Sequence, residues 1–309
     1  MCITGERVTV GDLVVNLGRI PHDGGAMGTA TSDFDYHLPP ELIAQHSVEP
    51  RDQSRLMIVD RGTGAFEHKR FYQILDELRV GDVLVMNNTK VFRARLRAKV
   101  SGREIELFLL RPRGEALGRS PATGEAWDVL VRPGKHVAID DTIQVGPISG
   151  HVVAKSEVLS VVFDLSAQEL IEFANKHGEI PVPPYVHEAP AQLDHYQTVY
   201  AKETGSVAAP TAGFHFTKEL LEKIREKGIE IHEVTLHVGI GTFRPMKTDT
   251  IEEHVMHSES VTMTTETAQA INKAKHEGRH VIAVGTTTVR TLEGVARVKT
   301  PLDPPLVRG

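Results

Sequence analysis

The chain is poor in cysteine and in long apolar runs, and both absences exclude whole classes of protein. A single cysteine, Cys2, cannot form an internal disulfide framework, which favours a reducing cytoplasmic location. No apolar run approaches membrane-spanning length, and charged residues interrupt the N-terminal stretch, so the sequence predicts neither a signal peptide nor a membrane anchor. An excess of positive charge is lacking too, because 35 Lys plus Arg residues stand against 41 Asp plus Glu residues. With a net charge of -6, any contact with nucleic acid must be local.

What is present suffices for a substantial core: 309 residues, 40% of them hydrophobic, predict a soluble globular protein of two domains. Strand and helix patterns that alternate near the C-terminus predict an α/β fold with a mixed, largely parallel sheet flanked by helices. Short strand patterns without a helix predict a small β-barrel inserted into it. The predicted divisions are a flexible N-terminal extension (1–32), an α/β catalytic domain (33–90 and 167–309) and the inserted barrel (91–166).

Several elements have clear boundaries in the sequence. Ser166 and Glu169 form a capping box that predicts a helix ending near Gly178. The other predicted helices cover 41–45, 71–80, 218–227 and 265–277, and predicted strands of the α/β domain cover 56–59, 83–86, 229–238 and 280–284.

Five polar clusters occur between residues 200 and 293, each where a predicted strand gives way to a loop or helix. Such loops, at the carboxyl ends of strands, are where α/β enzymes usually bind ligands. A helix that begins after Gly285 would also point free backbone N–H groups at the end of the sheet, which suits a carboxylate or phosphate. The clusters are 200–202 (YAK), 209–216 (APTAGFHF), 237–245 (HVGIGTFRP), 252–259 (EEHVMHSE) and 284–293 (VGTTTVRTLE).

A cationic stripe is predicted on the strand 90–100, whose strict alternation places Arg93, Arg95, Arg97 and Lys99 on one face. Two interpretations stay open. The stripe is either a solvated strand face or a surface that follows the backbone of a nucleic acid.

Taken together, the motifs resemble a known family. Besides the five clusters, the matching motifs are 33–45 (DFDYHLPPELIAQ), 52–56 (DQSRL), 181–187 (PVPPYVH) and 196–202 (YQTVYAK). From Ser32 to about Arg297 the chain resembles the S-adenosylmethionine:tRNA ribosyltransferase-isomerases of queuosine biosynthesis. The resemblance implies an α/β domain with an inserted β-barrel.

The resemblance also implies a reaction. The ribosyl part of S-adenosylmethionine is transferred to the aminomethyl group of a 7-deazaguanine base at the tRNA wobble position. It is rearranged to an epoxycyclopentane, and adenine and methionine are released. The implied partners are this tRNA and S-adenosylmethionine, which is consumed as a substrate, so no separate cofactor, metal or membrane is expected. Nothing in the sequence specifies an oligomeric state.

Such chemistry needs a general base for a proton next to the sulfonium, donors for the methionine carboxylate and adenine, and a site that excludes water. The sequence does not choose among the candidate bases His215, His237, Glu253, His254, His257 and Glu259. Candidate substrate-binding residues are Thr211, Phe214, Phe216, Thr242, Phe243, Arg244, Glu259, Thr286, Thr287, Thr288 and Arg290. Candidate tRNA contacts are Asn88, Arg93, Arg95 and Arg97.

Two rival functions remain. Glu253, His254 and His257, with His237 nearby, have the ligand types of a zinc-dependent hydrolase, although their spacing differs from the metalloprotease helix motif. A noncatalytic tRNA-binding module built on the cationic stripe is the other.

The resemblance stops before the C-terminus. A Trp-Thr segment and an Asn-Phe-His-Leu-Pro motif of the family have no counterpart, and the chain ends instead in a proline-rich tail from Lys299 to Gly309. We therefore expect impaired turnover relative to a longer version that carries those elements. The N-terminal extension also lies outside the resemblance.

Overall fold

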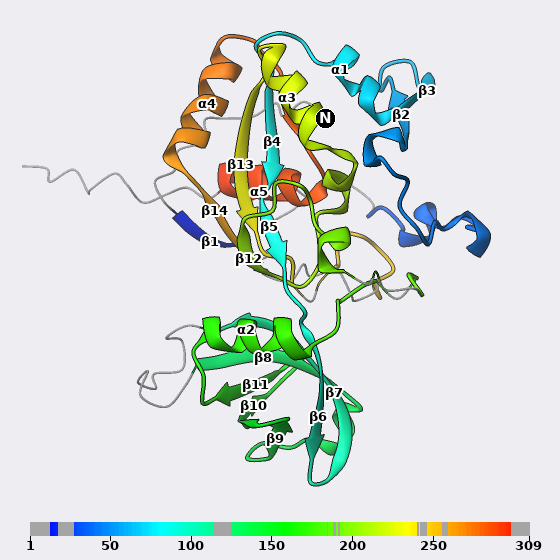
Figure 1. Cartoon of the computed structure of the whole chain (residues 1–309). Helices are drawn as coiled ribbons and strands as arrows, with labels where there is room; N and C mark the ends of the chain where they lie inside the picture. Colours follow the sequence, from blue (N-terminus) through cyan, green and yellow to red (C-terminus); the bar gives the residue numbers. More distant parts are fainter. Residues whose placement is uncertain are drawn as a thin grey trace, which may run out of the picture.

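The structure, a computed structural model, has an α/β lobe and a β-barrel lobe (Figure 1). It describes residues 28–113, 125–183, 185–187, 190, 192–239, 241, 246–254 and 259–297, together with the backbone of 13–17.

A five-stranded mixed sheet with the order β1-β14-β13-β4-β15 forms the centre of the α/β lobe. The parallel pairings lie among β15, β4 and β13. β14 runs antiparallel to both of its neighbours, β13 and the edge strand β1. The mixed sheet confirms the predicted fold class. Its strands are β1 (Leu13–Leu17), β4 (Val83–Asn87), β13 (Glu230–Leu236), β14 (Glu259–Met263) and β15 (Val281–Ala283).

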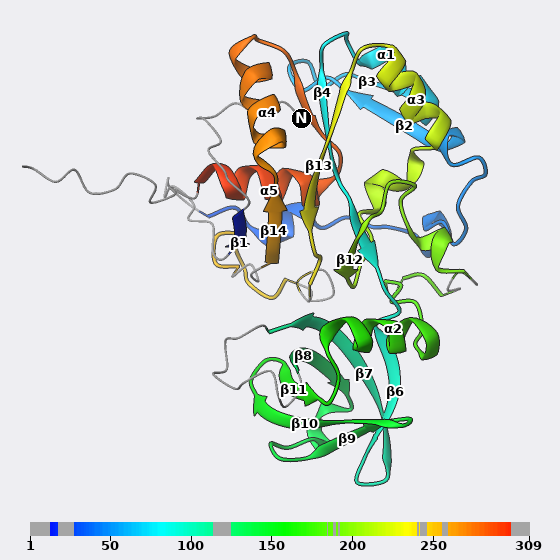
Figure 2. The same ribbon diagram turned by 60° about the vertical axis from the view of Figure 1, so that its left-hand side comes forward.

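Helices cover both faces of this sheet (Figures 1 and 2). Apolar residues of α4 and α5 pack on one face, where Ile271 and Leu292 join the sheet's buried valines. Residues of α3 pack on the other, where Leu220 and Ile224 meet Leu84. Each helix buries one stripe because its apolar residues recur at helical spacing. The helices are α3 (Lys218–Glu226), α4 (Thr265–His276) and α5 (Thr286–Arg297).

The inserted lobe is a closed barrel with the strand order β10-β11-β8-β7-β6-β9. Closure leaves no free sheet edge, which suits a chain of short strands. The helix α2 (Ala167–His177) begins at the predicted capping box, with Ser166 Oγ accepting from the Glu169 N–H, and buries Leu170 and Ala174 in the barrel core. The strands are β6 (Arg95–Val100), β7 (Arg103–Pro112), β8 (Glu125–Arg132), β9 (Thr142–Val145), β10 (Ile148–Lys155) and β11 (Leu159–Phe163).

Smaller elements surround the two lobes. The hairpin of β2 and β3 and the helix α1 precede the sheet, and the short parallel pair of β5 and β12 continues from it towards the barrel. The bounds are β2 (Arg55–Val59), β3 (Phe66–Arg70), α1 (Ile74–Glu77), β5 (Thr89–Val91) and β12 (Glu203–Ser206).

Three local predictions are wrong in detail. The helix predicted at 41–45 is a three-residue 3-10 turn, and the one predicted at 71–80 is a 3-10 turn followed by the four-residue α1. The strand predicted at 90–100 breaks at 92–94, where the chain passes from the α/β lobe to the barrel. The predicted flexible extension also contributes to the α/β lobe, since β1 pairs with β14 and Ala30 bridges Thr250.

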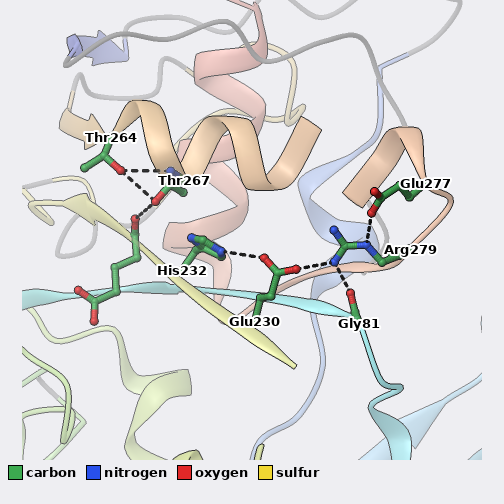
Figure 3. A network of polar contacts seen from close by, with 8 residues as sticks. Gly81, Glu230, His232, Thr264, Thr267, Glu277 and Arg279 are labelled. Carbon is green, nitrogen blue, oxygen red and sulfur yellow. Dashed lines mark hydrogen bonds and ion pairs between the residues drawn. The ribbon is translucent and has the colours of Figure 1, made fainter. Parts of the chain in front are cut away.

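Charged side chains join the amino ends of the parallel strands (Figure 3). Arg279, just before β15, donates to the Gly81 carbonyl and forms ion pairs with Glu230 at 2.9 Å and Glu277 at 2.8 Å. Glu230 also lies 3.3 Å from His232 Nε2. Burial pushes the pKa of Glu230 up, but hydrogen bonds from His232 and Arg279 outweigh it and lower that pKa. The network thus ties the starts of β4, β13 and β15 together.

No helix in the part of the chain that the structure describes is long and apolar enough to cross a membrane.

Candidate functional site

The predicted clusters meet at the carboxyl ends of β4, β13 and β15. Both views show β4 and β13 pointing towards the barrel lobe (Figures 1 and 2). Antiparallel β14 begins at the same end, because Leu236 of β13 faces Val261 of β14. The strand pair of β5 and β12 starts there as well, so loops from distant parts of the sequence are brought side by side.

His237 follows β13 directly and is held from two sides. Its Nδ1 lies 2.8 Å from Thr89 Oγ1. Its ring packs on Gly205, where an added Cβ would approach the ring atoms to 2.9 Å, so glycine is required there for this contact. Burial lowers the pKa of His237, and the charge of Glu203 opposes this shift. The imidazole is therefore held in place, and burial favours its neutral form.

Asn87, at the end of β4, fixes the local backbone. Its amide is fully buried, donates to the Leu236 carbonyl at 3.1 Å and accepts from the N–H groups of Leu236 and Thr89. One side chain thus joins the ends of two neighbouring strands and orients the residue that contacts His237.

An ion pair with a buried carboxylate lies beside this histidine. Arg290 of α5 lies 3.0 Å from Glu259, whose side chain is only 7% exposed. Glu259 also accepts from the Gly239 N–H at 3.1 Å. Glu259 thus joins its own cluster, 252–259, to the clusters 284–293 and 237–245. Its carboxylate holds Arg290 and the 237–239 turn.

The N-terminus of α5 opens on the 3-10 turn Thr211–His215. Gly285 adopts a φ of +83°, and a Cβ added there would lie 3.1 Å from Ala212, so the two segments are in close contact. In the first turn of α5, the Thr287 hydroxyl is buried with no hydrogen-bond partner among the described residues. The free N–H groups of this turn and the hydroxyl form a polar end directed at the site.

Tyr200 adds a second buried hydroxyl. Its side chain joins the core cluster that contains Phe216, and its hydroxyl lacks a hydrogen-bond partner within the described ranges. Burial, with the charge of Glu233 as a smaller cause, raises the pKa of this phenol well above its usual value. It is a neutral group that can donate a hydrogen bond.

His215 and Phe214 lie at the far end of the same 3-10 turn. His215 packs against Phe71 with ring centroids 5.2 Å apart, and burial together with the Arg51 charge lowers its pKa. The Arg51 guanidinium lies 5.7 Å from the centre of the Phe214 ring. Thr211, at the start of the turn, is exposed.

Three predicted contact residues are corrected by their surroundings. Phe216 is 1% exposed within the core, so it cannot stack on a base. Thr288 is fully buried and donates to the Val284 carbonyl, whereas Thr286 is exposed and Thr287 is partly exposed. Asn88 is 8% exposed, and its amide bonds to Glu233 and Thr235, so it cannot contact tRNA.

Glu253 and His254 lie in a turn that is joined to residues 28–31, where Ile251 N donates to the Thr29 carbonyl. Within the described residues, no hydrogen bond or ion pair links them to the site, and no group of three His, Cys, Asp or Glu side chains is arranged to hold a metal. Four predicted site residues lie outside the described residues, namely Thr242, Phe243, Arg244 and His257.

The predicted cationic stripe is paired with carboxylates on the barrel. Arg95 lies 3.6 Å from Glu106 and Arg97 lies 3.2 Å from Glu179. Arg93 precedes the strand and donates to the Gly178 carbonyl. Their predicted role in tRNA binding stays a prediction, as do the roles of the other site residues.

Sequence reasoning missed Thr89 and Asn87 as parts of the site. The available signal was their position, a short polar run directly after the fully buried strand β4. The sequence contains no signal for the contact between Thr89 and His237, which are 148 residues apart.

Comparison with known proteins agrees with the earlier resemblance. A family model described as queuosine biosynthesis protein matches residues 31–304. The S-adenosylmethionine:tRNA ribosyltransferase-isomerase of Desulfitobacterium hafniense is 46% identical over 275 residues, covering 85% of this chain and 76% of that protein. A crystal structure of the S-adenosylmethionine tRNA ribosyltransferase of Thermotoga maritima is 35% identical, covering 87% of this chain and 74% of that one, with a TM-score of 0.41. The chain therefore belongs to the queuosine biosynthesis protein family.

Proposed function

We propose that the chain is an S-adenosylmethionine:tRNA ribosyltransferase-isomerase. It transfers the ribosyl part of S-adenosylmethionine to a 7-aminomethyl-7-deazaguanine base at the tRNA wobble position. The aminomethyl nitrogen gains a bond to the ribosyl carbon skeleton, the carbon–sulfur bond breaks to release methionine, and the glycosidic bond breaks to release adenine. The ribosyl carbons remain on the tRNA as the epoxycyclopentane of epoxyqueuosine. S-adenosylmethionine is consumed, so no separate cofactor is required.

The fixed, neutral His237 at the meeting point of the clusters is the single observation that carries this proposal. A general base for the proton next to the sulfonium must be unprotonated at neutral pH, and the lowered pKa of His237 meets that need. Thr89 Oγ1 can donate to the Glu203 carbonyl at 3.5 Å and accept a hydrogen bond from His237 Nδ1–H. That tautomer leaves the Nε2 lone pair free to take the proton.

The N-terminus of α5 suits the methionine end of the substrate. Its free backbone N–H groups and helix dipole favour a carboxylate, and the unpartnered Thr287 hydroxyl adds a donor. Arg290, one turn further along, brings a guanidinium held by Glu259. With His237 beside them, these groups bracket a substrate that carries a carboxylate at one end and the reacting sulfonium near the other.

His215 remains the second candidate base, since burial and Arg51 lower its pKa as well. Phe214 and Arg51 beside it offer an aromatic ring and a cation, which suit an adenine or a 7-deazaguanine. In this assignment the 3-10 turn Thr211–His215 binds a base, and His237 acts on the ribosyl group.

Adenine release tests the function directly. Purified protein is incubated with S-adenosylmethionine and tRNA that carries the 7-aminomethyl-7-deazaguanine base, and adenine, methionine and modified tRNA are quantified. We expect all three in equal amounts, and none with tRNA that carries guanine at that position. Adenine without modified tRNA would indicate simple hydrolysis, and no adenine at all would indicate a noncatalytic binder; either result rejects the proposal.

A further inference from the structure

The barrel carries a cleft that the reaction chemistry does not use. It is a cavity of about 540 Å³ on the outer face of β6 and β7, beside the start of the β9–β10 turn. A smaller cavity of about 200 Å³ continues from it towards the C-terminal end of α2, and the two share Arg95, Leu96, Arg97, Gly146 and Glu179. Ligand pockets in proteins typically occupy roughly 300 to 1,000 Å³, so the larger cavity is of sufficient size for one nucleoside.

The charges of this cleft are nearly balanced. Arg95 pairs with Glu106 at 3.6 Å, Arg97 with Glu179 at 3.2 Å, and Lys99 with Glu104 at 3.9 Å. A surface that binds a phosphate backbone presents an excess of cations, whereas three of the four cations that line this cleft lie beside a carboxylate. The fourth, Arg132, is the strand partner of Glu106 in the pairing of β7 with β8. Guanidinium donors next to carboxylate acceptors instead match the edge of a nucleobase, which carries both kinds of group.

An aromatic pair lines the smaller cavity. Phe173 and His177, one turn apart on α2, lie with ring centroids 4.6 Å apart, and both border the cavity. His177 is exposed, so one of its faces is available. Proteins that bind single-stranded RNA stack unpaired bases on such rings.

The cleft also lies within reach of the candidate active site along the chain. Thr89, the partner of His237, is separated from Arg95 by β5 and the linker 92–94. Six residues span at most about 20 Å. A nucleic acid strand whose reacting base is near His237 can therefore place a neighbouring nucleotide on the barrel.

We propose that this cleft binds one unpaired base of the substrate tRNA, a base other than the one that reacts. Arg97 and Glu179 contact the edge of the base, and His177 stacks on its face. The proposal rests on the proposed function for the identity of the RNA. It assigns the barrel the task of reading sequence next to the modified position.

An abasic-site cycle tests the proposal without turnover. RNA hairpins that reproduce the anticodon arm are made with one loop base at a time removed, and their affinity is measured by fluorescence anisotropy in the absence of S-adenosylmethionine. His177→Ala is expected to weaken binding of the intact hairpin roughly tenfold. At one loop position, removal of the base should weaken binding to the unsubstituted protein by a similar factor. Removal of the same base should not weaken binding to the His177→Ala variant any further. If the two losses multiply at every position, no base occupies the cleft.

A charge-neutral variant separates a base from a phosphate. Arg97→Gln combined with Glu179→Gln keeps the net charge while removing the groups that contact the base edge. We expect roughly tenfold weaker binding with an unchanged salt dependence. A fall of about one in the slope of log affinity against log salt would assign the cleft to a phosphate and overturn the proposal. Arg103→Ala, an exposed arginine on β7 outside the cleft, is the matched control and should change neither quantity.

Turnover gives an independent check. In His177→Ala the KM for tRNA in the adenine-release assay should rise about tenfold, while kcat at saturating tRNA is unchanged. A fall in kcat with an unchanged KM would contradict a role in binding. If adenine release is absent in the unsubstituted protein, the proposed function fails, and the binding cycle still decides whether a base occupies the cleft. Unfolding midpoints of all variants are compared to detect loss of stability. If His177→Ala is unstable, the double variant Arg97→Gln with Glu179→Gln tests the proposal instead.

Discussion

The two ends of the central sheet differ in whether their polar side chains have hydrogen-bond partners. At the amino ends of β4, β13 and β15, Arg279 is paired with a carbonyl and two carboxylates (Figure 3). Asp82, just before β4, accepts from the Arg79 N–H and lies 3.2 Å from His280 Nδ1. At the carboxyl ends, the hydroxyls of Thr287 and Tyr200 are buried without a hydrogen-bond partner in the described part of the chain.

The difference separates stability from function. A buried donor without a partner costs about 1 to 3 kcal/mol, so a fold retains it only where other interactions compensate. The satisfied amino end supplies such compensation by joining three strand starts. At the carboxyl end, the unpartnered hydroxyls are available to a ligand. Burial there lowers the pKa of His237, because water solvates the charged form of a histidine better than the protein interior does. Substitutions at the two ends should therefore affect different measurements.

The largest effect is expected from His237→Ala at the carboxyl end. Loss of a general base typically lowers kcat by about 10² to 10⁴. The unfolding free energy should change far less, because His237 contributes one hydrogen bond and modest packing. Adenine-release kinetics and urea unfolding measure the two quantities. His232→Gln, which changes a histidine near the amino end of β13, is the matched control and should retain kcat. If both variants lose turnover equally, the assignment of the base to His237 is wrong.

Arg279→Met should reverse this pattern at the amino end. The substitution removes two ion pairs and the bond to the Gly81 carbonyl while retaining the apolar stem, and Glu230 loses a partner. We expect the unfolding free energy to fall by about 1 to 3 kcal/mol with kcat unchanged. Arg61→Met, an exposed arginine in the turn between β2 and β3, should alter stability by no more than about 0.5 kcal/mol. A large loss of kcat at a temperature where Arg279→Met is folded would show that the two ends are coupled.

Thr89→Val tests whether the Thr89 hydroxyl orients His237 at the carboxyl end. Valine has nearly the same shape as threonine but cannot accept a hydrogen bond from His237 Nδ1–H, so the tautomer and orientation of the ring are no longer fixed. We expect kcat to fall roughly tenfold, in line with the loss of one hydrogen bond. Thr89→Ser retains the hydroxyl and should restore most of the loss. If serine and valine behave alike, the hydroxyl does not orient His237.

Most of the fold could be predicted from the sequence, because local patterns indicate the strands and helices of the sheet and the barrel. The capping box at Ser166, the helices α3 and α4 and the strands β13 and β15 end within a few residues of their predicted bounds. Periodicity and capping are short-range signals, and they act on every residue of an element. The short helix predicted at 71–80 failed because packing of Phe71 against Phe216 and His215, rather than helical periodicity, decides that segment.

The strand β14 and the details of the site were not accessible in this way. Glu259 was predicted within a loop cluster, yet it begins β14 because β13 and the extension offer pairing partners on both sides. The burial of Asn88 and Thr288 likewise depends on which strand lies next to them, a long-range property that residue type does not encode. Sequence identified which loops meet, whereas only the structure separates the residues that face the site from those that hold it.

The pH dependence of stability gives the smallest but most selective comparison of the two ends. The pKa of His237 is lowered by burial from 6.5, so the folded protein disfavours its protonation. Its contribution to stability is complete above the unfolded-state pKa and decreases as pH falls below about 6.5. The same holds for His215. Glu230 has a pKa lowered from 4.5, so its contribution is complete above about pH 4.5 and is lost only in stronger acid.

Urea unfolding between pH 3.5 and 8 should therefore reveal two separate windows. His237→Gln should flatten the fall in unfolding free energy just below about pH 6.5, leaving the part that His215 contributes. Glu230→Gln should leave that window intact and flatten the fall below about pH 4.5. Because each variant removes one titrating group from one end of the sheet, the two windows report the two ends independently. A single acid transition that both variants change alike would mean that the ends unfold as one electrostatic unit, and the separation of stabilising from functional polar groups along the sheet would not hold.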